Sequence, residues 1–181
     1  MSQAIGWCSF ETAVGHCTMA WTADGRVQAM HLPEADGAAP RGRMQQRLGA
    51  AAEAPPPAAL VQVIQRLQAA LQGAPDTLAD VPLDDDDVPE FHRRVYALAR
   101  AIPPGQTRSY GELAAALGEP GAARAVGQAL GRNPFAPLVP CHRVLAAGRR
   151  GGGFSAPGGL ATKLRLLQLE GAELGRQAGL F

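Results

Sequence analysis

The stretch Pro140-Cys141-His142-Arg143-Val144 places a cysteine beside a histidine, directly after a proline. A cysteine becomes a strong nucleophile when a neighbouring base or positive charge converts its thiol to a thiolate. Prolines at positions 134, 137 and 140 restrict the backbone that leads to the cysteine, since each fixes its own φ and restrains the preceding residue. The pentapeptide alone leaves a second interpretation open, because a buried structural cysteine beside a surface histidine is also common.

The composition indicates one large or two small globular domains. The chain has 181 residues, of which 46% are hydrophobic. No window approaches the roughly 18 apolar residues of a membrane helix, and the first residues do not form a basic and then apolar secretory signal. Three cysteines are too few, and odd in number, for a disulfide framework. We therefore expect a cytoplasmic protein with reduced thiols and no membrane partner.

The net charge of +1 hides a strong asymmetry between the two halves. Residues 1–89 contain 5 arginines against 11 acidic residues, a net charge of −6. Residues 90–181 contain 12 basic residues against 5 glutamates, a net charge of +7. A basic half is typical of proteins that bind a polyanion. The alternative, that the two halves attract each other, stays open at this point.

The first half predicts a small sheet followed by one helix. Apolar runs on both sides of Asp24-Gly25 predict a hairpin within strands over residues 5–33. Residues 34–59, rich in alanine, glycine and proline, predict a loop. The next apolar residues recur with a helical period and predict one buried helix face. They are Leu60, Ile64, Leu67 and Leu71.

Two groups of possible metal ligands occur in this half. Cys8, His16, Cys17 and His31 fall in the predicted sheet, but they lack CxxC or HxxxH spacing, so we favour buried thiols over a zinc site. The acidic run over residues 84–87 lacks the central glycine and closing glutamate of a calcium loop. We interpret it as a linker and place the domain boundary between residues 87 and 88.

The second half predicts a helix-turn-helix. After a helix that begins at residue 88 and stops before Pro103, Ser109 and Glu112 form a capping-box pattern that predicts a helix over residues 109–117. A tight glycine-containing turn then leads to a second helix over residues 122–130. This helix is small on every side except for Arg124 and Gln128, so it can approach a duplex closely. A helical hairpin that packs internally is the alternative.

Beyond the cysteine, a glycine-rich loop precedes the last predicted helix. Residues 147–159 offer backbone amides to a flat ligand, but they lack the GxxxxGK[ST] pattern of a phosphate loop. Leu160, Leu164 and Leu167 predict the buried face of a helix over residues 160–170. Glu170 lies near the negative end of this helix dipole, which is unfavourable on a surface, so we expect a specific partner for it.

In order and spacing, these segments resemble the O6-alkylguanine-DNA alkyltransferases, also called methylated-DNA–protein-cysteine S-methyltransferases. The resemblance is strong over residues 88–174 and weak over residues 1–80. It is carried by the quoted pentapeptide, by Asn133-Pro134 and by residues 109–114, 122–127 and 159–171. It implies an α/β (α+β) fold with a small N-terminal sheet-plus-helix domain, residues 1–87. A mostly helical C-terminal domain with the helix-turn-helix, residues 88–181, follows.

The resemblance also implies a role for each matching residue. Cys141 would accept the alkyl group, His142 would act as a base through a water, Glu170 would orient His142, and Asn133 would brace the turn before the cysteine. Arg124 would fill the space left by a flipped base, and Tyr110 would help to rotate that nucleotide. The implied DNA-contacting set is Tyr110, Ala123, Arg124, Gln128 and Arg143. The implied alkylguanine pocket is Tyr110, Pro140, Val144, Phe154 and Ser155.

The implied activity is direct repair of O6-alkylguanine, and also of O4-alkylthymine, by irreversible transfer to Cys141. Thiolate attack on an alkyl carbon is a displacement, so it needs no cofactor or metal, and each monomer would react once with duplex DNA. Three alternatives remain: a lesion-binding protein without transfer activity, a helix-turn-helix regulator and a cysteine hydrolase. Relatives of the first kind lack the cysteine, no effector or dimerisation region is evident for the second, and the third would turn over repeatedly.

Overall fold

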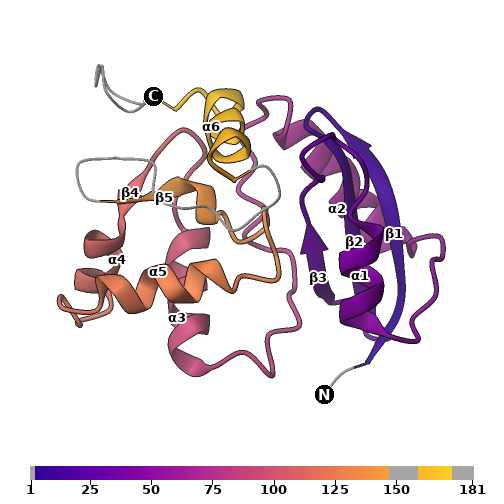
Figure 1. Ribbon diagram of the computed structural model, residues 1–181, viewed down its shortest axis with the longest axis horizontal. Coiled ribbons are helices and arrows are strands. Elements are labelled where there is room, and N and C mark those ends of the chain that lie inside the picture. The colour runs from indigo at the N-terminus through magenta and orange to yellow at the C-terminus, as the bar shows by residue number, and fades with distance from the viewer. Residues whose placement is uncertain (1–2, 147–158, 173–181) are drawn as a thin grey trace.

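The computed structural model describes residues 3–146 and 159–172, and it confirms the mixed α/β fold. A three-stranded sheet with two helices lies beside a group of helices, and the last helix lies near the junction of the two parts (Figure 1). The first part consists of β1 (Ala4–Thr12), β2 (Gly15–Thr22), β3 (Val27–His31), α1 (Arg41–Leu48) and α2 (Ala58–Ala70). The second consists of α3 (Glu90–Arg100), β4 (Arg108–Ser109), α4 (Tyr110–Ala116), α5 (Ala123–Gly131), η1 (Cys141–Arg143), β5 (Val144–Leu145) and α6 (Gly159–Leu169).

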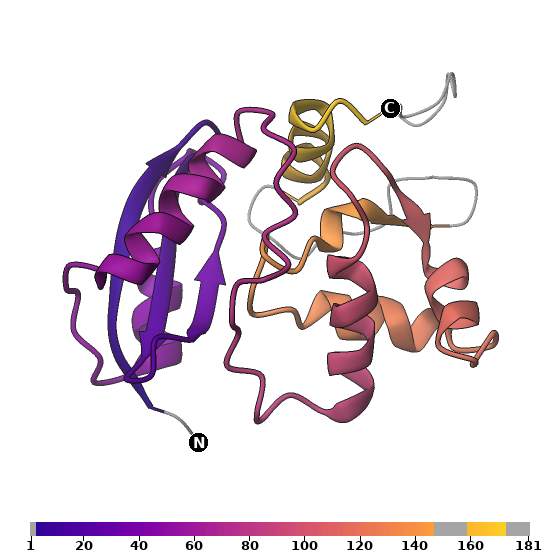
Figure 2. The ribbon, with the colours of Figure 1, turned by 180° about the vertical axis from the view of Figure 1, so that it is seen from behind.

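The sheet is antiparallel in the order β1-β2-β3, and the predicted hairpin at Asp24-Gly25 is confirmed. Side chains alternate between its two faces, as the pleat requires. Trp7, Ala20 and Ala29 form one buried cluster with Met44 of α1. Cys8, Met19, Trp21 and Met30 join the main core, which also includes α2 and the helical part. Figure 2 shows α2 against the sheet from behind.

One of the two helices beside the sheet was not expected from the sequence. The predicted loop over residues 34–59 contains α1, which follows Pro40 and ends at Gly49. Met44 is the single buried residue of this helix, so no apolar stripe marks it in the sequence. The predicted stripe of α2 is confirmed, because all four of its apolar residues are buried.

The free edge of β3 connects the sheet to the second part of the chain. Met30 forms a parallel bridge with Phe135, and its N–H donates to the Pro134 carbonyl at 2.8 Å. Val27 forms a second bridge with Leu83. Two ion pairs connect the acidic run to the hairpin. Arg26 Nη1 lies 3.0 Å from a carboxylate oxygen of Asp84 and 3.0 Å from one of Asp86. The boundary between residues 87 and 88 stays a prediction.

The two short helices of the predicted helix-turn-helix are confirmed as α4 and α5. Ser109 Oγ accepts the Glu112 N–H at 3.0 Å, and the Glu112 carboxylate accepts the Ser109 N–H at 2.6 Å. This capping box satisfies two amides at the start of α4. Gly118, with φ +78°, follows the end of α4. The Tyr96 hydroxyl of α3 donates to the Ala129 carbonyl of α5 at 2.9 Å, so this hydrogen bond connects the two helices.

The last helix confirms its predicted position and part of its predicted face. Leu167 is buried as predicted and Leu164 is half-buried, but Leu160 is 39% exposed, and Lys163 and Leu166 are buried instead. The sequence pattern was misleading because a buried lysine lies where an apolar residue would be expected. No helix in the described ranges is long and apolar enough to cross a membrane.

We expect Ser109→Ala to lower the free energy of unfolding by about 1 kcal/mol, because it removes the N-cap of α4. Ser109→Thr keeps an accepting hydroxyl and serves as the control. Urea denaturation followed by circular dichroism measures both variants. Equal stability of Ser109→Ala and the wild type would contradict the role of the cap.

Candidate active site

Asn133 fixes the loop that carries the cysteine. Its side-chain amide donates to the Val139 carbonyl at 2.8 Å, and its carbonyl oxygen accepts the Phe135 N–H at 2.9 Å. One side chain thus closes the six-residue turn between the end of α5 and Cys141. Residues 134–140 are all buried, so the approach to the cysteine is packed as well as hydrogen-bonded.

The Cys141 thiol lies at the start of η1 and is 7% exposed. Burial is the largest influence on the thiol and raises its pKa above the ordinary value. A hydrogen bond with the Asn133 side chain and the positive charge of Lys163 act in the opposite direction. The cysteine is therefore protonated at rest, with groups beside it that favour the thiolate once the proton leaves.

His142, 2% exposed, is paired with Glu170 across 2.7 Å between Nε2 and Oε1. Burial lowers the pKa of His142, and Glu170 counteracts this only in part. A neutral ring that donates its Nε2 hydrogen to the carboxylate keeps Nδ1 as an acceptor. Nδ1 is buried and has no hydrogen-bond partner within the described part of the chain. The pair thus presents a neutral base with a defined tautomer.

Arg143 also binds the Glu170 carboxylate that pairs with His142. Its Nε and Nη2 donate to the Glu170 carboxylate at 2.7–3.2 Å, and its Nη1 donates to the Ile102 carbonyl at 2.7 Å. Burial alone would raise the pKa of Glu170, but the hydrogen bonds from His142 and Arg143 lower it to about 2. The prediction that Arg143 contacts DNA does not fit this placement. Its guanidinium is buried and occupied inside the protein.

Lys163 is a site residue that the sequence pattern did not identify. It is 1% exposed, and its Nζ donates to the Val144 carbonyl at 2.8 Å. Burial lowers its pKa, while the neighbouring Cys141 raises it. The one signal in the sequence was its position at a helical spacing from Leu160 and Leu167. Hydropathy does not predict burial there, because lysine is almost never fully buried without a partner.

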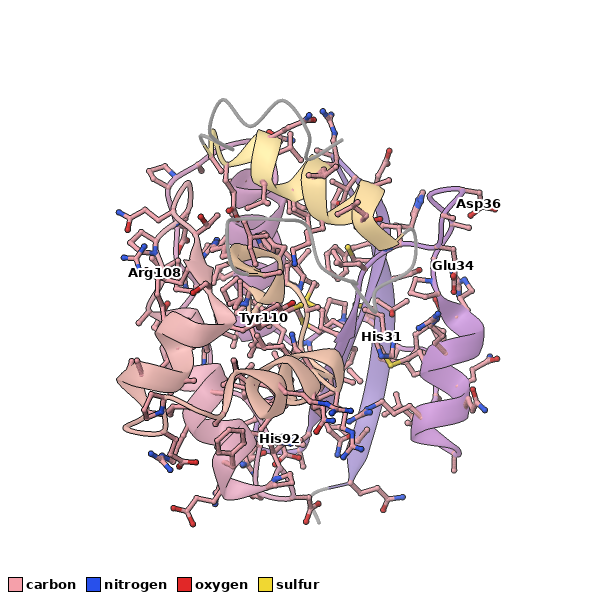
Figure 3. The ribbon with its side chains drawn as sticks, turned by 60° about the vertical axis from the view of Figure 1, so that its left-hand side comes forward. His31, Glu34, Asp36, His92, Arg108 and Tyr110 are labelled. Atoms are coloured by element: carbon pink, nitrogen blue, oxygen red, sulfur yellow. The ribbon has the colours of Figure 1, made fainter. Side chains whose placement is uncertain are left out.

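A pocket of about 170 Å³ has Cys141 in its wall. It is lined by Met30, His31 and Leu32 of β3 and its end, by Arg43 and Arg47 of α1, and by Leu130, Gly131, Arg132, Asn133, Pro134, Ala136 and Cys141. Figure 3 shows the labelled His31 on the sheet side of this region. Pro140 and Val144 of the predicted pocket are buried and do not line this one, and neither does Tyr110. Phe154 and Ser155 lie outside the described residues.

The chain is similar to known proteins in both sequence and structure. Residues 90–172 match the family described as 6-O-methylguanine DNA methyltransferase, DNA binding domain. A Mycobacterium tuberculosis protein named methylated-DNA–protein-cysteine methyltransferase is 46% identical over 116 residues, which cover 64% of this chain and 68% of that relative. The chain belongs to the methylated-DNA–protein-cysteine methyltransferase family. A Mycolicibacterium paratuberculosis relative of the same name is 56% identical over 81 residues, 45% of this chain and 48% of that one.

The fold of this methyltransferase family member extends beyond the matched segment. The structure resembles the crystal structure of Mycobacterium tuberculosis OGT in complex with DNA, with a TM-score of 0.75 and 33% identity over 92% of this chain and 93% of that one. It also resembles the O6-methylguanine-DNA methyltransferase of Pyrococcus kodakaraensis, with a TM-score of 0.67 and 26% identity over 92% and 99%. The chain spans about half the length of the first curated relatives that it matches.

The predicted DNA-contacting helix of this family member presents a polar face. Arg124 and Gln128 are exposed on α5, and Ala123 is partly buried. The Tyr110 ring lies 3.9 Å from the position that a Cβ on Gly127 would take, an ordinary contact distance, so Tyr110 faces α5 at Gly127. Figure 3 shows Tyr110 near the centre of the helical part. In the described ranges, no three histidine, cysteine or acidic side chains group in a way that could hold a metal ion.

We expect the stabilising effect of Glu170 to depend on pH. Its folded pKa of about 2 lies below the ordinary value of 4.5, so the fold favours the ionised form. This contribution is complete above pH 4.5 and is lost as the pH falls toward 2. The stability advantage of the wild type over Glu170→Gln should therefore shrink across this range. Chemical denaturation at a series of pH values tests this, and a pH-independent difference would contradict it.

We expect Lys163→Met to slow alkylation of Cys141 by iodoacetamide at pH 8 roughly threefold to tenfold, because the positive charge beside the thiolate is lost. Lys163→Arg keeps the charge and is the control. The rate is followed by intact mass on protein in which Cys8 and Cys17 are replaced by alanine. An unchanged rate would show that the charge of Lys163 does not act on the thiol.

Proposed function

We propose that this protein repairs O6-alkylated guanine in duplex DNA by transferring the alkyl group to Cys141. The observation that carries the proposal is the set of contacts around one thiol. Asn133 and the charge of Lys163 both favour the Cys141 thiolate, and the buried His142–Glu170 pair follows directly in the chain. The family to which the chain belongs and the DNA complex of its M. tuberculosis structural neighbour support the same activity.

The proposed reaction is one displacement. The thiol proton passes through a water to His142 Nδ1, because adjacent residues rarely present both side chains to one direct hydrogen bond. Glu170 stabilises the protonated ring through Nε2. The thiolate then attacks the alkyl carbon, so that an S–C bond forms while the C–O6 bond breaks. Guanine leaves with the electron pair on O6 and takes up a proton as it returns to its ordinary form.

This chemistry needs neither a cofactor nor a metal, and it ends in a thioether that water does not hydrolyse. Each molecule would react once. We propose that the chain acts as a monomer in the cytoplasm, with duplex DNA that contains O6-alkylguanine as its partner and O4-alkylthymine as a second substrate.

The target base must leave the duplex, because its O6 substituent is out of reach inside the stack. We assign this step to α4 and α5. Arg124, exposed on α5, would enter the duplex and replace the flipped base, and Tyr110 would turn the nucleotide toward Cys141. A damaged pair costs less to open than a normal one, which gives selectivity for the lesion.

We expect incubation with a duplex carrying one O6-methylguanine to increase the intact mass of the protein by one methyl group in place of a hydrogen. The gain should stop at one group per molecule, because the thioether is stable. Peptide mapping should place it on Cys141, and Cys141→Ala should show none. Arg124→Ala should form the same product roughly 10-fold or more slowly, because base flipping is impaired.

The outcomes separate the proposal from its rivals. Tight binding of the lesion duplex without a mass gain would indicate a recognition protein. Continued release of product without stable modification would indicate a hydrolase. Either result would overturn the proposed transfer.

A further inference from the structure

The pocket beside Cys141 has a positively charged rim that the proposed reaction does not use. Arg43 and Arg47 reach it from α1, and Arg132 reaches it from the end of α5. All three arginines are exposed. In Figure 3, side-chain nitrogens gather between the end of α5 and α1, beside the labelled His31. Within the described ranges no acidic residue lines this pocket.

Two of these arginines have no counter-charge within the described part of the chain. Arg43 lies 3.6 Å from the Glu34 carboxylate. The guanidinium groups of Arg47 and Arg132 have no hydrogen-bond or ion-pair partner in residues 3–146 and 159–172. Arg47 is exposed as a whole residue, but neighbouring atoms desolvate it in part and lower its pKa. A partly desolvated charge without a partner is unfavourable, and a bound anion offsets that cost.

The floor of the pocket is apolar, whereas its rim is positively charged. Met30, Leu32, Leu130 and Cys141 are buried and form an apolar surface that holds the thiol. His31 adds no positive charge there at neutral pH, because burial and the nearby Arg47 and Arg43 lower its pKa to about 4. A rim of cations above an apolar floor suits a nucleotide, whose base is flat and weakly polar and whose phosphates are anionic.

The arginines also continue the polar face of α5. Arg124, Gln128 and Arg132 follow one another at steps of four residues, and all three are exposed. This row spans about 12 Å at 1.5 Å per residue. Arg132, the last residue of the row, lines the same pocket as Arg47, so the positively charged surface continues from α5 to α1. A duplex that lies along α5 would reach both arginines.

We propose that Arg47 of α1, together with Arg132, binds the DNA backbone phosphates beside the flipped nucleotide. The N-terminal part is then a component of the DNA-binding surface as well as a support for the active site. This inference rests on the proposed function, because it takes the nucleotide over Cys141 as its reference point. Phosphate contacts fix the position of a duplex and carry no sequence information, so this pair acts on affinity for any duplex.

The test is the salt dependence of duplex binding by Arg47→Gln and Arg132→Gln. Each lost phosphate contact should reduce the slope of log affinity against log salt concentration by about one. Near physiological salt each variant should bind roughly threefold to tenfold more weakly, by the same factor for a lesion duplex and an undamaged one. Arg47→Lys should restore most of the slope, because the charge is kept. Fluorescence anisotropy over a range of salt concentrations measures all of these.

Arg41→Gln is the matched control. It removes the same charge from the same helix, but Arg41 is bound to Glu53 and lies over the Trp7 ring, 5.8 Å from its centroid. Its slope should equal that of the wild type. An unchanged slope in Arg47→Gln, or an equal loss in Arg41→Gln, would overturn the inference.

The two proposals fail in different ways. If the wild type gains no methyl group from a lesion duplex, the proposed function fails, whatever the slopes are. If the wild type is methylated on Cys141 while Arg47→Gln keeps the full slope, only the role of α1 fails. Circular dichroism of each variant confirms that a reduced slope does not come from unfolding.

Discussion

The carboxylate of Glu170 is the group on which the site depends. It accepts hydrogen bonds from His142 and from two nitrogens of Arg143, and it is itself nearly buried, with a side chain 10% exposed. A buried carboxylate is stable only with such partners. Removal of any one of the three groups would leave buried charge or polarity without a partner. The triad therefore joins η1 to the end of α6 and fixes the base beside the thiol.

The same triad constrains its surroundings. Arg143 uses its remaining contact on the Ile102 carbonyl, which connects η1 to the end of α3. Gly105, with φ +86°, lies so close that a Cβ there would be 3.1 Å from the Glu170 carbonyl oxygen. About two turns before Glu170, in α6, Lys163 donates to the Val144 carbonyl. The last helix thus supplies both a positive and a negative group to η1, one on each side of the reactive pair.

Local signals in the sequence were enough for the parts of the fold that local chemistry decides. The capping box at Ser109, the hairpin at Asp24-Gly25 and the apolar stripe of α2 are each complete within a few residues, and all are confirmed. The pairing of His142 with Glu170 was also expected, but from the family resemblance. The burial of Arg143 and Lys163 was not, because both side chains are neutralised or hydrogen-bonded by groups 19 to 41 residues away. Sequence hydropathy cannot identify a buried charge whose partner exists only in the folded state.

The ion pairs of the first half show what its excess of acidic residues does. Many carboxylates of the first half are bound by arginines of that same half. These pairs are Arg26 with Asp24, Asp84 and Asp86, Arg41 with Glu53, Arg43 with Glu34, and Arg66 with Asp76 and Asp80. Attraction between oppositely charged halves would instead require those carboxylates to face the basic part. Because they are neutralised locally, the positive charge of α5 and its surroundings stays available to an external polyanion. Arg47 then belongs to that positive surface by its position at the pocket and by its lack of a partner in residues 3–146 and 159–172, although it lies in the acidic half of the sequence.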